Sequence, residues 1–254
     1  MTAVQYIIEG GHKLAGSIRP SGHKNGALPI VAASLLSQSP VRLTNVTRIR
    51  DLETLVEQIR SVGATAEWTE RNTLDIFAAE LRPQRLDPAL SARIRASILL
   101  AAPLLARCGN VTLPAPGGDV IGRRRLDTHF LAMTQLGVRV IEEDGYKMSV
   151  DRLVGADVFL DEPSVTGTEN ALILAAAAEG TTILRNAASE PHVQDLADFL
   201  VALGARIEGI GTNTITVHGG SSLGASPVSH MIGPDHIEVG AFIGLAAVTH
   251  SELR

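Results

Sequence analysis

Helix-like segments that are apolar on every side restrict the fold more than any other feature of the sequence. They lie at Asn25–Leu36, Ile94–Ala106 and Glu169–Ala178, and are rich in alanine, leucine and isoleucine. A helix with no polar face has to be enclosed by protein or by lipid. Each segment has roughly 10–13 residues, whereas a membrane span needs about 20. We therefore expect these helices to be buried together inside a globular core.

Each apolar segment belongs to a repeat of about 70 residues. Short strand-like pieces follow the segments at Val41–Val46, Val111–Pro116 and Thr182–Ala187. After each strand comes a helix with one apolar and one charged face, and glycine then provides the usual helix C-cap. These amphipathic helices are predicted at Leu52–Val62, Asp127–Leu136 and Val193–Leu203. A further apolar helix is expected at Val239–Val248, followed by the first residues of another strand.

The repeat predicts an α/β fold of three βαβαββ-like units, with the apolar helices buried together and the sheets outside. The alternative is a doubly wound sheet with helices on both faces, which the all-apolar helices disfavour. The formal net charge of −5 argues against nucleic-acid binding. No apolar stretch reaches about 18 residues, so we expect no membrane span. Cys108 is the single cysteine, which excludes a disulfide framework and fits a cytoplasmic protein.

Basic residues at helix starts, and a glycine-rich loop, predict an anion site. Lys24 and Asn25 begin the first apolar helix, Arg95 begins the second, and the loop Leu113–Thr128 carries three consecutive arginines after Asp119. Helix N-termini favour anions, and arginine binds phosphate or carboxylate through two donors. Taken singly, each feature also fits a capping turn or a solvated loop. Together they indicate one site.

Four motifs carry a resemblance to a known family. They read G-x-K-N-x-A-L-P from Gly22, R-A-S from Arg95, L-P-x-x-G-G-D-x-I-G-x-R-x-x-D-x-H from Leu113, and N-A-A-x-E-P-x-x-x-D-L from Asn186. Across essentially its whole length the chain resembles the UDP-N-acetylglucosamine enolpyruvyl transferases (1-carboxyvinyltransferases). The related shikimate-pathway enzymes share the fold but prefer K-S and N-A-G-T at two of these places. The resemblance implies an inside-out α/β barrel.

The implied activity is transfer of the enolpyruvyl group of phosphoenolpyruvate to the 3-hydroxyl of UDP-N-acetylglucosamine, the first committed step of peptidoglycan synthesis. No metal or organic cofactor is implied. By position, Lys24 and Asn25 match the family's phosphoenolpyruvate-binding pair, and Arg95 and Arg124 match its anion-binding arginines. Asp119 stands where most members have a cysteine that protonates the substrate's methylene carbon. The implied catalytic residues are therefore Asp119, Lys24 and Arg124.

Two further stretches match those that hold the uridine nucleotide in the family. They are Arg124, Arg125, Leu126, Asp127 and Thr128, and then Glu162, Pro163, Ser164 and Val165. Arg125 replaces a usual proline and Glu162 a usual lysine. These two departures leave open an enolpyruvyl transferase that acts on another nucleotide.

By the resemblance, residues 21–232 form the domain that carries the catalytic loop, and residues 1–20 with 233–254 form an incomplete part of a second domain. We accordingly expect the chain to end within a fourth unit. A half-length protein that binds a sugar nucleotide without catalysis is the alternative from another class. Fosfomycin inactivates the family by alkylating the loop thiolate, so Asp119 predicts insensitivity to this drug. The sequence gives no indication of the oligomeric state.

Overall fold

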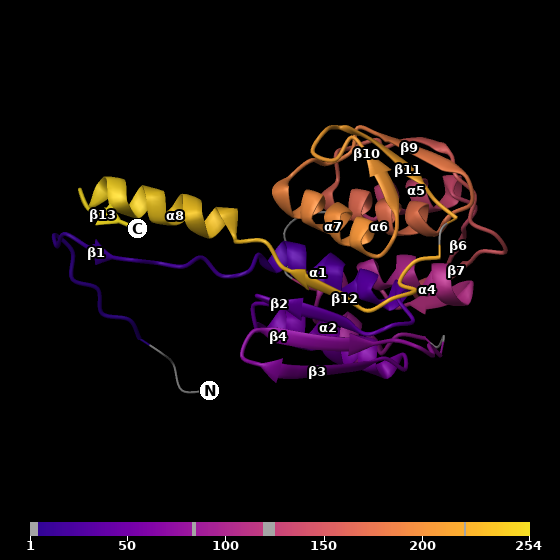
Figure 1. Ribbon diagram of the computed structural model, residues 1–254. Coiled ribbons are helices and arrows are strands. Elements are labelled where there is room, and N and C mark those ends of the chain that lie inside the picture. The colour runs from indigo at the N-terminus through magenta and orange to yellow at the C-terminus, as the bar shows by residue number, and fades with distance from the viewer. Residues whose placement is uncertain (1–4, 83–84, 119–124, 221) are drawn as a thin grey trace. The chain divides into compact units, whose positions relative to one another are not determined.

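The structure is a computed structural model that describes residues 5–82, 85–118, 125–220 and 222–254 (Figure 1). Within this described part, the chain separates into two compact units. The core unit is Gly22–Gly233, and the terminal unit combines Met1–Ser21 with Pro234–Arg254. In the same ranges, none of the helices has the length and apolar character that crossing a membrane requires.

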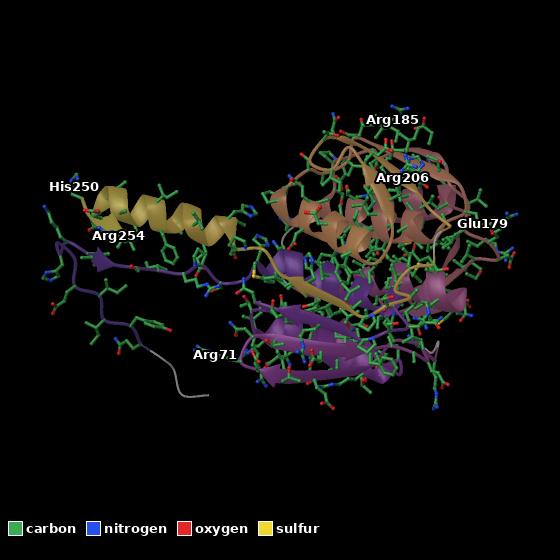
Figure 2. All side chains as sticks on the ribbon, in the orientation of Figure 1. Arg71, Glu179, Arg185, Arg206, His250 and Arg254 are labelled. Atoms are coloured by element: carbon green, nitrogen blue, oxygen red, sulfur yellow. The ribbon has the colours of Figure 1, made fainter. Side chains whose placement is uncertain are left out.

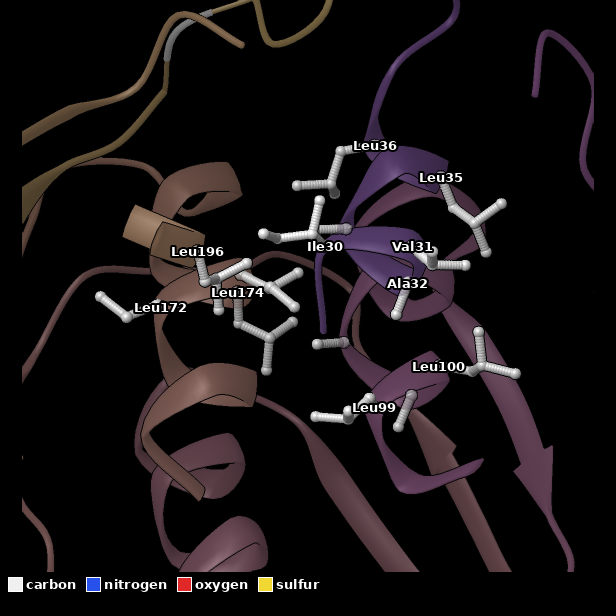
Figure 3. Close-up of a cluster of buried hydrophobic side chains, with 14 of the residues drawn as sticks. Ile30, Val31, Ala32, Leu35, Leu36, Leu99, Leu100, Leu172, Leu174 and Leu196 are labelled. Carbon is white, nitrogen blue, oxygen red and sulfur yellow. The ribbon is translucent and has the colours of Figure 1, made fainter. Parts of the chain in front are cut away.

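The apolar segments form the centre of the core unit, as predicted. They are α1 (Lys24–Ala33) with the 3-10 turn η1 (Ser34–Leu36), the 3-10 helix η2 (Arg95–Leu100) continued by α4 (Ala101–Cys108), and α6 (Val165–Ala177). Ile30, Leu99 and Leu174 from these helices are at most 1% exposed and belong to one cluster (Figure 3). The second segment begins as a 3-10 helix, which periodicity did not predict. Pro103 cannot donate the α-helical hydrogen bond to the Leu99 carbonyl.

The amphipathic helices are also confirmed, with ends that agree to within a few residues. They are α2 (Arg50–Ser61), α5 (Asp127–Gln135) and α7 (Pro191–Ala202). On α2, Leu52 and Ile59 are buried while Glu57 and Arg60 are exposed. The glycines that follow these helices all have positive φ, the conformation expected at a C-cap; they are Gly63, Gly137 and Gly204.

In the described part of the core unit the strands form three sheets on the outside (Figure 1). The first sheet has the order β12 (Val228–Met231), β2 (Val41–Thr44), β4 (Thr73–Phe77), β3 (Thr65–Glu70). The second has the order β5 (Asn110–Leu113), β7 (Tyr146–Ser149), β6 (Arg139–Glu142). The third has the order β10 (Arg206–Glu208), β11 (Thr214–His218), β9 (Thr181–Arg185), β8 (Asp157–Phe159). On β2, Val41 and Leu43 are buried and Arg42 is exposed. Such alternation means that one face of the sheet meets solvent, so the doubly wound alternative is wrong.

Equivalent contacts recur between repeats. Each of β2, β5 and β9 has a parallel partner. β12 pairs with β2 and β8 pairs with β9, while Arg85 forms an isolated parallel bridge to Thr112 of β5. After β2, Asn45 has positive φ and donates from Nδ2 to the Ile232 carbonyl at 2.9 Å. After β9, Asn186 does the same toward the Leu160 carbonyl at 2.9 Å. Because β12 comes from the far end of the core unit, it closes the ring of repeats.

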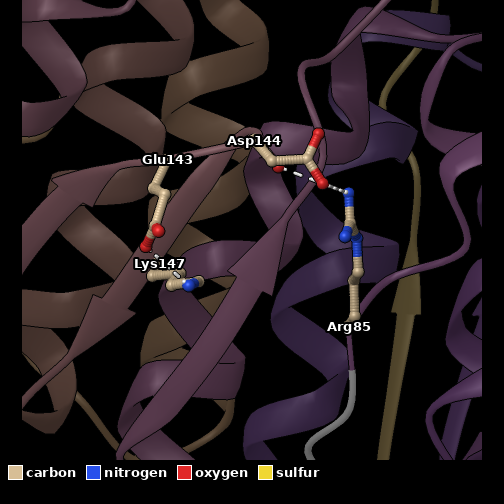
Figure 4. Close-up of polar contacts among 4 residues, drawn as sticks. All are labelled: Arg85, Glu143, Asp144 and Lys147. Carbon is tan, nitrogen blue, oxygen red and sulfur yellow. Dashed lines mark hydrogen bonds and ion pairs between the residues drawn. The ribbon is translucent and has the colours of Figure 1, made fainter.

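Ion pairs cover the outer surface of the core unit. Arg185 on β9 donates hydrogen bonds to Asp157 on β8, and the labelled Arg185 lies at the outer edge of the core unit (Figure 2). Arg85 and Asp144 form a 2.7 Å pair beside the pair Glu143–Lys147 (Figure 4). Exposed pairs of this kind contribute little to stability.

The terminal unit is small and cannot enclose its own apolar helix. It contains the parallel strands β1 (Ala15–Gly16) and β13 (Glu252–Leu253), and α8 (His236–Val248). The helix predicted at Val239–Val248 is present and none of its residues is buried: Ile243 is 67% exposed and Val248 78%. Two strands of two residues each offer too little surface to cover it.

Candidate functional site

A cavity of about 660 Å³ opens in the core unit where the N-termini of α1 and α6 approach η2. Its volume is typical of small-molecule sites. Its lining mixes basic side chains with a few acidic and apolar ones: Lys24, Asn25, Leu28, Asp51, Ala92, Arg93, Ile94, Arg95, Ala96, Leu99, Gly118, Val165, Thr166, Glu169 and His192. The structure therefore brings together three residues that the sequence predicted for one anion site, Lys24, Asn25 and Arg95, and adds Val165 from a stretch predicted to hold the nucleotide.

The first turn of α1 supplies Lys24 and Asn25. His23 caps this helix, because its Nδ1 accepts from the Gly26 amide at 3.2 Å. The free amides of a helix N-terminus favour an anion, and a lysine adds a full positive charge. Lys24 Nζ lies 2.6 Å from Asp51 Oδ2 at the start of α2, with both side chains about two-fifths exposed. The lysine is thus held at the cavity by a partner that an incoming anion could replace.

The segment before η2 supplies Arg93 and anchors the glycine-rich loop, and the first residue of η2 is Arg95. Gly117 donates to the Ser91 carbonyl at 2.9 Å, and a Cβ on Gly117 would lie 1.8 Å from the Ala92 carbonyl oxygen. No residue with a side chain fits there without a shift of the backbone. The next residue, Gly118, lines the cavity. Asp119 and Arg124, predicted as catalytic, follow Gly118 in the sequence and lie outside the described residues.

A buried histidine fixes the first turn of α6 against α5. His129 Nδ1 lies 2.9 Å from Asn170 Nδ2, and Nε2 lies 3.1 Å from the Oγ1 of the cavity residue Thr166. Burial, with a smaller contribution from the Arg95 charge, lowers the pKa of His129 from 6.5 to about 4. The imidazole is therefore neutral at physiological pH. It serves as a rigid link behind the cavity wall.

The residues predicted to hold a nucleotide form a second group beside the cavity, at the starts of α5 and α6. Thr128 is buried and its Oγ1 donates to Asp161 Oδ1 at 2.6 Å. Ser164 caps α6, and its Oγ accepts from the Gly167 amide at 3.2 Å. Leu126 is buried, whereas Arg125, Asp127, Glu162 and Pro163 are exposed. Arg125 is ion-paired with Asp127, and its carbonyl accepts from Arg95 Nη2 at 3.1 Å.

Among the cavity residues that sequence reasoning did not assign to the site are Asp51, Glu169 and His192. His192, on α7, stacks on His23 with ring centroids 4.8 Å apart and planes 8° apart. Nothing in the sequence pattern places α2 or α7 at the cavity, so Asp51 and His192 could not have been found. Glu169 did leave a signal, because a carboxyl in an otherwise apolar helix requires an explanation.

Three apolar helices enclosed by outer sheets, with basic residues gathered at the helix starts, define the class: an inside-out α/β fold of the enolpyruvyl transferase type. The sequence matches the family EPSP synthase (3-phosphoshikimate 1-carboxyvinyltransferase) over residues 8–254. The chain belongs to this family.

Relatives named UDP-N-acetylglucosamine 1-carboxyvinyltransferase are similar over nearly the whole chain. The protein from Bradyrhizobium diazoefficiens is 68% identical over 254 residues, which are 100% of this chain and 58% of that one. The protein from Treponema denticola is 49% identical over 250 residues, covering 98% of this chain and 58% of that one. The chain thus spans somewhat more than half the length of these relatives.

Solved structures agree on the fold. The enolpyruvyl transferase NikO from Streptomyces tendae is 28% identical with a TM-score of 0.79, covering 93% of this chain and 56% of that one. EPSP synthase from Acinetobacter baumannii is 18% identical with a TM-score of 0.76, covering 97% of this chain and 56% of that one, a likeness of fold.

Proposed function

We propose that the chain is part of an enzyme that transfers the enolpyruvyl group of phosphoenolpyruvate to the 3-hydroxyl of UDP-N-acetylglucosamine. In the addition step the hydroxyl oxygen bonds to C2 of phosphoenolpyruvate, its proton passes to a base, and C3 takes up a proton. In the elimination step the C2–O bond to phosphate breaks and C3 loses a proton, which restores the methylene group. The products are the enolpyruvyl ether and inorganic phosphate.

The cavity carries this proposal. Lys24 and Asn25 from the first repeat, and Arg95 from the second, meet at one cavity although 70 residues separate them. Gathering cations at helix N-termini is unfavourable without an anion, since the helix dipole already makes these positions positive. A ligand with a phosphate and a carboxylate, such as phosphoenolpyruvate, supplies two negative groups. The relatives' names support the same substrate class.

Asp119 and Arg124 complete the proposed chemistry. Arg124 is proposed to stabilise phosphate, and Asp119 to donate the proton that C3 takes up. A free aspartate is ionised at neutral pH. The proposal therefore requires substrate binding to desolvate the carboxyl beside the phosphate charge, which favours the protonated form. The loop anchor at Gly117 and Gly118 supports the position of this group near the cavity.

The group Arg125–Thr128 with Glu162–Val165 is proposed to hold the uridine nucleotide. Arg125 offers a phosphate donor, although it is now paired with Asp127. The negative Glu162 would repel a diphosphate in its neighbourhood. This residue favours a second candidate acceptor, another nucleotide with a different phosphate position. As the first committed step of peptidoglycan synthesis, the reaction would take place in the cytoplasm and serve cell-wall growth and division.

The test uses a hybrid protein in which this chain replaces the matching part of the Bradyrhizobium relative, which is 68% identical. Phosphate release from phosphoenolpyruvate is measured with UDP-N-acetylglucosamine, with UDP-glucose and with 3-phosphoshikimate as acceptors. The proposal predicts release that depends on UDP-N-acetylglucosamine and a product heavier by one enolpyruvyl group. The Lys24→Ala hybrid is the matched control and should lose this release. Phosphate release that depends on another acceptor would refute the proposal. So would the absence of phosphate release with every acceptor, provided that the relative itself is active.

A further inference from the structure

Glu169 is a buried acid at the proposed anion cavity that the reaction scheme leaves unused. It lies one turn into α6, lines the cavity and is 1% exposed. Among the described residues, neither of its carboxyl oxygens has a hydrogen-bond partner. Burial raises the pKa of this carboxyl well above its ordinary value, and the charge of Glu190 raises it further.

An unpaired buried carboxyl destabilises a fold, and methionine would fill the same space at lower cost. The groups around it do not form a salt bridge with it. They are Lys24 on α1, Asp51 on α2, Arg93 and Arg95 at η2, His129 on α5, and Glu190 and His192 at α7. A carboxyl that keeps its proton has an O–H to donate and does not repel an anion. Burial disfavours the ionised form of Glu169, and in its protonated form the carboxyl offers the cavity a neutral donor.

We propose that Glu169 binds the substrate's oxyanion as a protonated hydrogen-bond donor and thereby sets the affinity of the cavity for phosphoenolpyruvate and phosphate. This inference rests on the proposed function for the identity of the substrate. Glu169 lines the cavity, and its three side-chain torsions give the O–H several orientations. The bound anion accepts that hydrogen bond, while Lys24 and Arg95 supply the positive charge.

The proposed donor predicts a specific pH dependence of the anion affinity. Wild-type anion affinity should fall as the pH rises through the pKa of Glu169, because the ionised carboxylate repels the ligand and has no proton to donate. Glu169→Gln keeps the shape and an N–H donor but does not titrate. Glu169→Met keeps the volume and removes the donor. Since Lys24, Asp51, Arg93, Arg95, His129, Glu190 and His192 are common to all three chains, their titration cancels in the comparison.

The experiment titrates the 254-residue chain with inorganic phosphate, and separately with acetate, by amide NMR from pH 5 to 8. At pH 6, Glu169→Met should bind phosphate about tenfold more weakly, the usual effect of losing a hydrogen bond to a charged group. Glu169→Gln should match the wild type at low pH and exceed it at high pH. A larger effect on phosphate than on acetate assigns the donor to phosphate; the reverse assigns it to carboxylate. Glu57→Met, at an exposed glutamate of α2, is the control and should change neither affinity.

Thermal unfolding separates a ligand-binding role from a structural one. Glu169→Met should raise the Tm, since it removes an unpaired polar group, even as it weakens anion binding. The inference is overturned if Glu169→Met binds phosphate as the wild type does, if it lowers the Tm, or if phosphate shifts no amide at the cavity of the wild type. None of these readouts depends on the acceptor sugar. Failure of the hybrid assay with a positive phosphate result would refute the proposed function and leave the donor assignment standing.

Discussion

Acid should destabilise the core unit in part by forcing a proton onto His129. This side chain is 3% exposed and joins Asn170 and Thr166 through its two ring nitrogens. Protonation would place a charge in the core and remove the acceptor that Asn170 Nδ2 uses. The fold therefore opposes protonation, and this opposition appears as a pKa lowered from 6.5 to about 4.

The sign follows from proton binding. Between pH 6.5 and about 4 the unfolded chain holds a proton on this histidine and the folded chain does not. The free energy of unfolding must then decrease as the pH falls through that window. A gap of about 2.5 pH units corresponds to about 3 kcal/mol by pH 4, of which about 2 kcal/mol is lost by pH 5.

Urea unfolding followed by tryptophan fluorescence measures this loss. Trp68 is the single tryptophan and lies on β3, so its signal reports on the core unit. The quantity of interest is the free energy of unfolding of the wild type minus that of His129→Gln at each pH. Glu169 changes the free energy of unfolding in the opposite direction, because a group with a raised pKa destabilises the folded state as the pH rises above 4.5. Both chains contain Glu169, so its contribution cancels in the difference. His218→Gln, on the outer strand β11, is the control.

The difference between wild type and His129→Gln should decrease by about 3 kcal/mol from pH 7 to 4. His218→Gln should show no such decrease relative to the wild type. A wild type minus His129→Gln difference that stays constant over this range would refute the neutral, buried role of His129.

Three other predictions concern the site. Asp51→Asn should bind phosphate a few-fold more tightly than the wild type in NMR titrations, because Lys24 loses its competing partner, whereas Lys24→Ala should bind at least about tenfold more weakly. In the hybrid protein, Asp119→Asn should lower turnover at least about 10²-fold in the phosphate-release assay, while Asp119→Cys should retain activity. The intact mass after long incubation with fosfomycin should show no adduct, because burial raises the pKa of the half-buried Cys108 thiol and so disfavours its reactive thiolate. An adduct on either Asp119 or Cys108 would contradict this prediction.

The sequence was sufficient to predict the layers of the core unit. The run Ala171–Ala178 has no polar side chain, so the fold has to bury it, and the sheets then lie outside. The repeat then located the amphipathic helices to within a few residues. Periodicity did not show that Arg95–Leu100 winds as a 3-10 helix. The exposure of α8 depends on what surrounds the helix, and the terminal unit offers it only two short strands.

The candidate site was predictable where the residues sit at the starts of buried helices. Lys24, Asn25 and Arg95 meet because their helices converge, and the repeat implied that convergence. Asp51 and His192 reach the cavity from α2 and α7, and the packing of these helices is not encoded in a local pattern. The roles of all these residues remain predictions.

A crystal structure of the 254-residue chain with phosphoenolpyruvate and UDP-N-acetylglucosamine tests the central claim most directly. We expect the phosphate of phosphoenolpyruvate in the cavity of the core unit, within hydrogen-bonding distance of Lys24 Nζ and the Arg95 guanidinium, with the Lys24–Asp51 pair broken. The account would be contradicted by phosphoenolpyruvate bound elsewhere, for example in the outer groove beside Arg42 and Asp75, while Lys24 still pairs with Asp51.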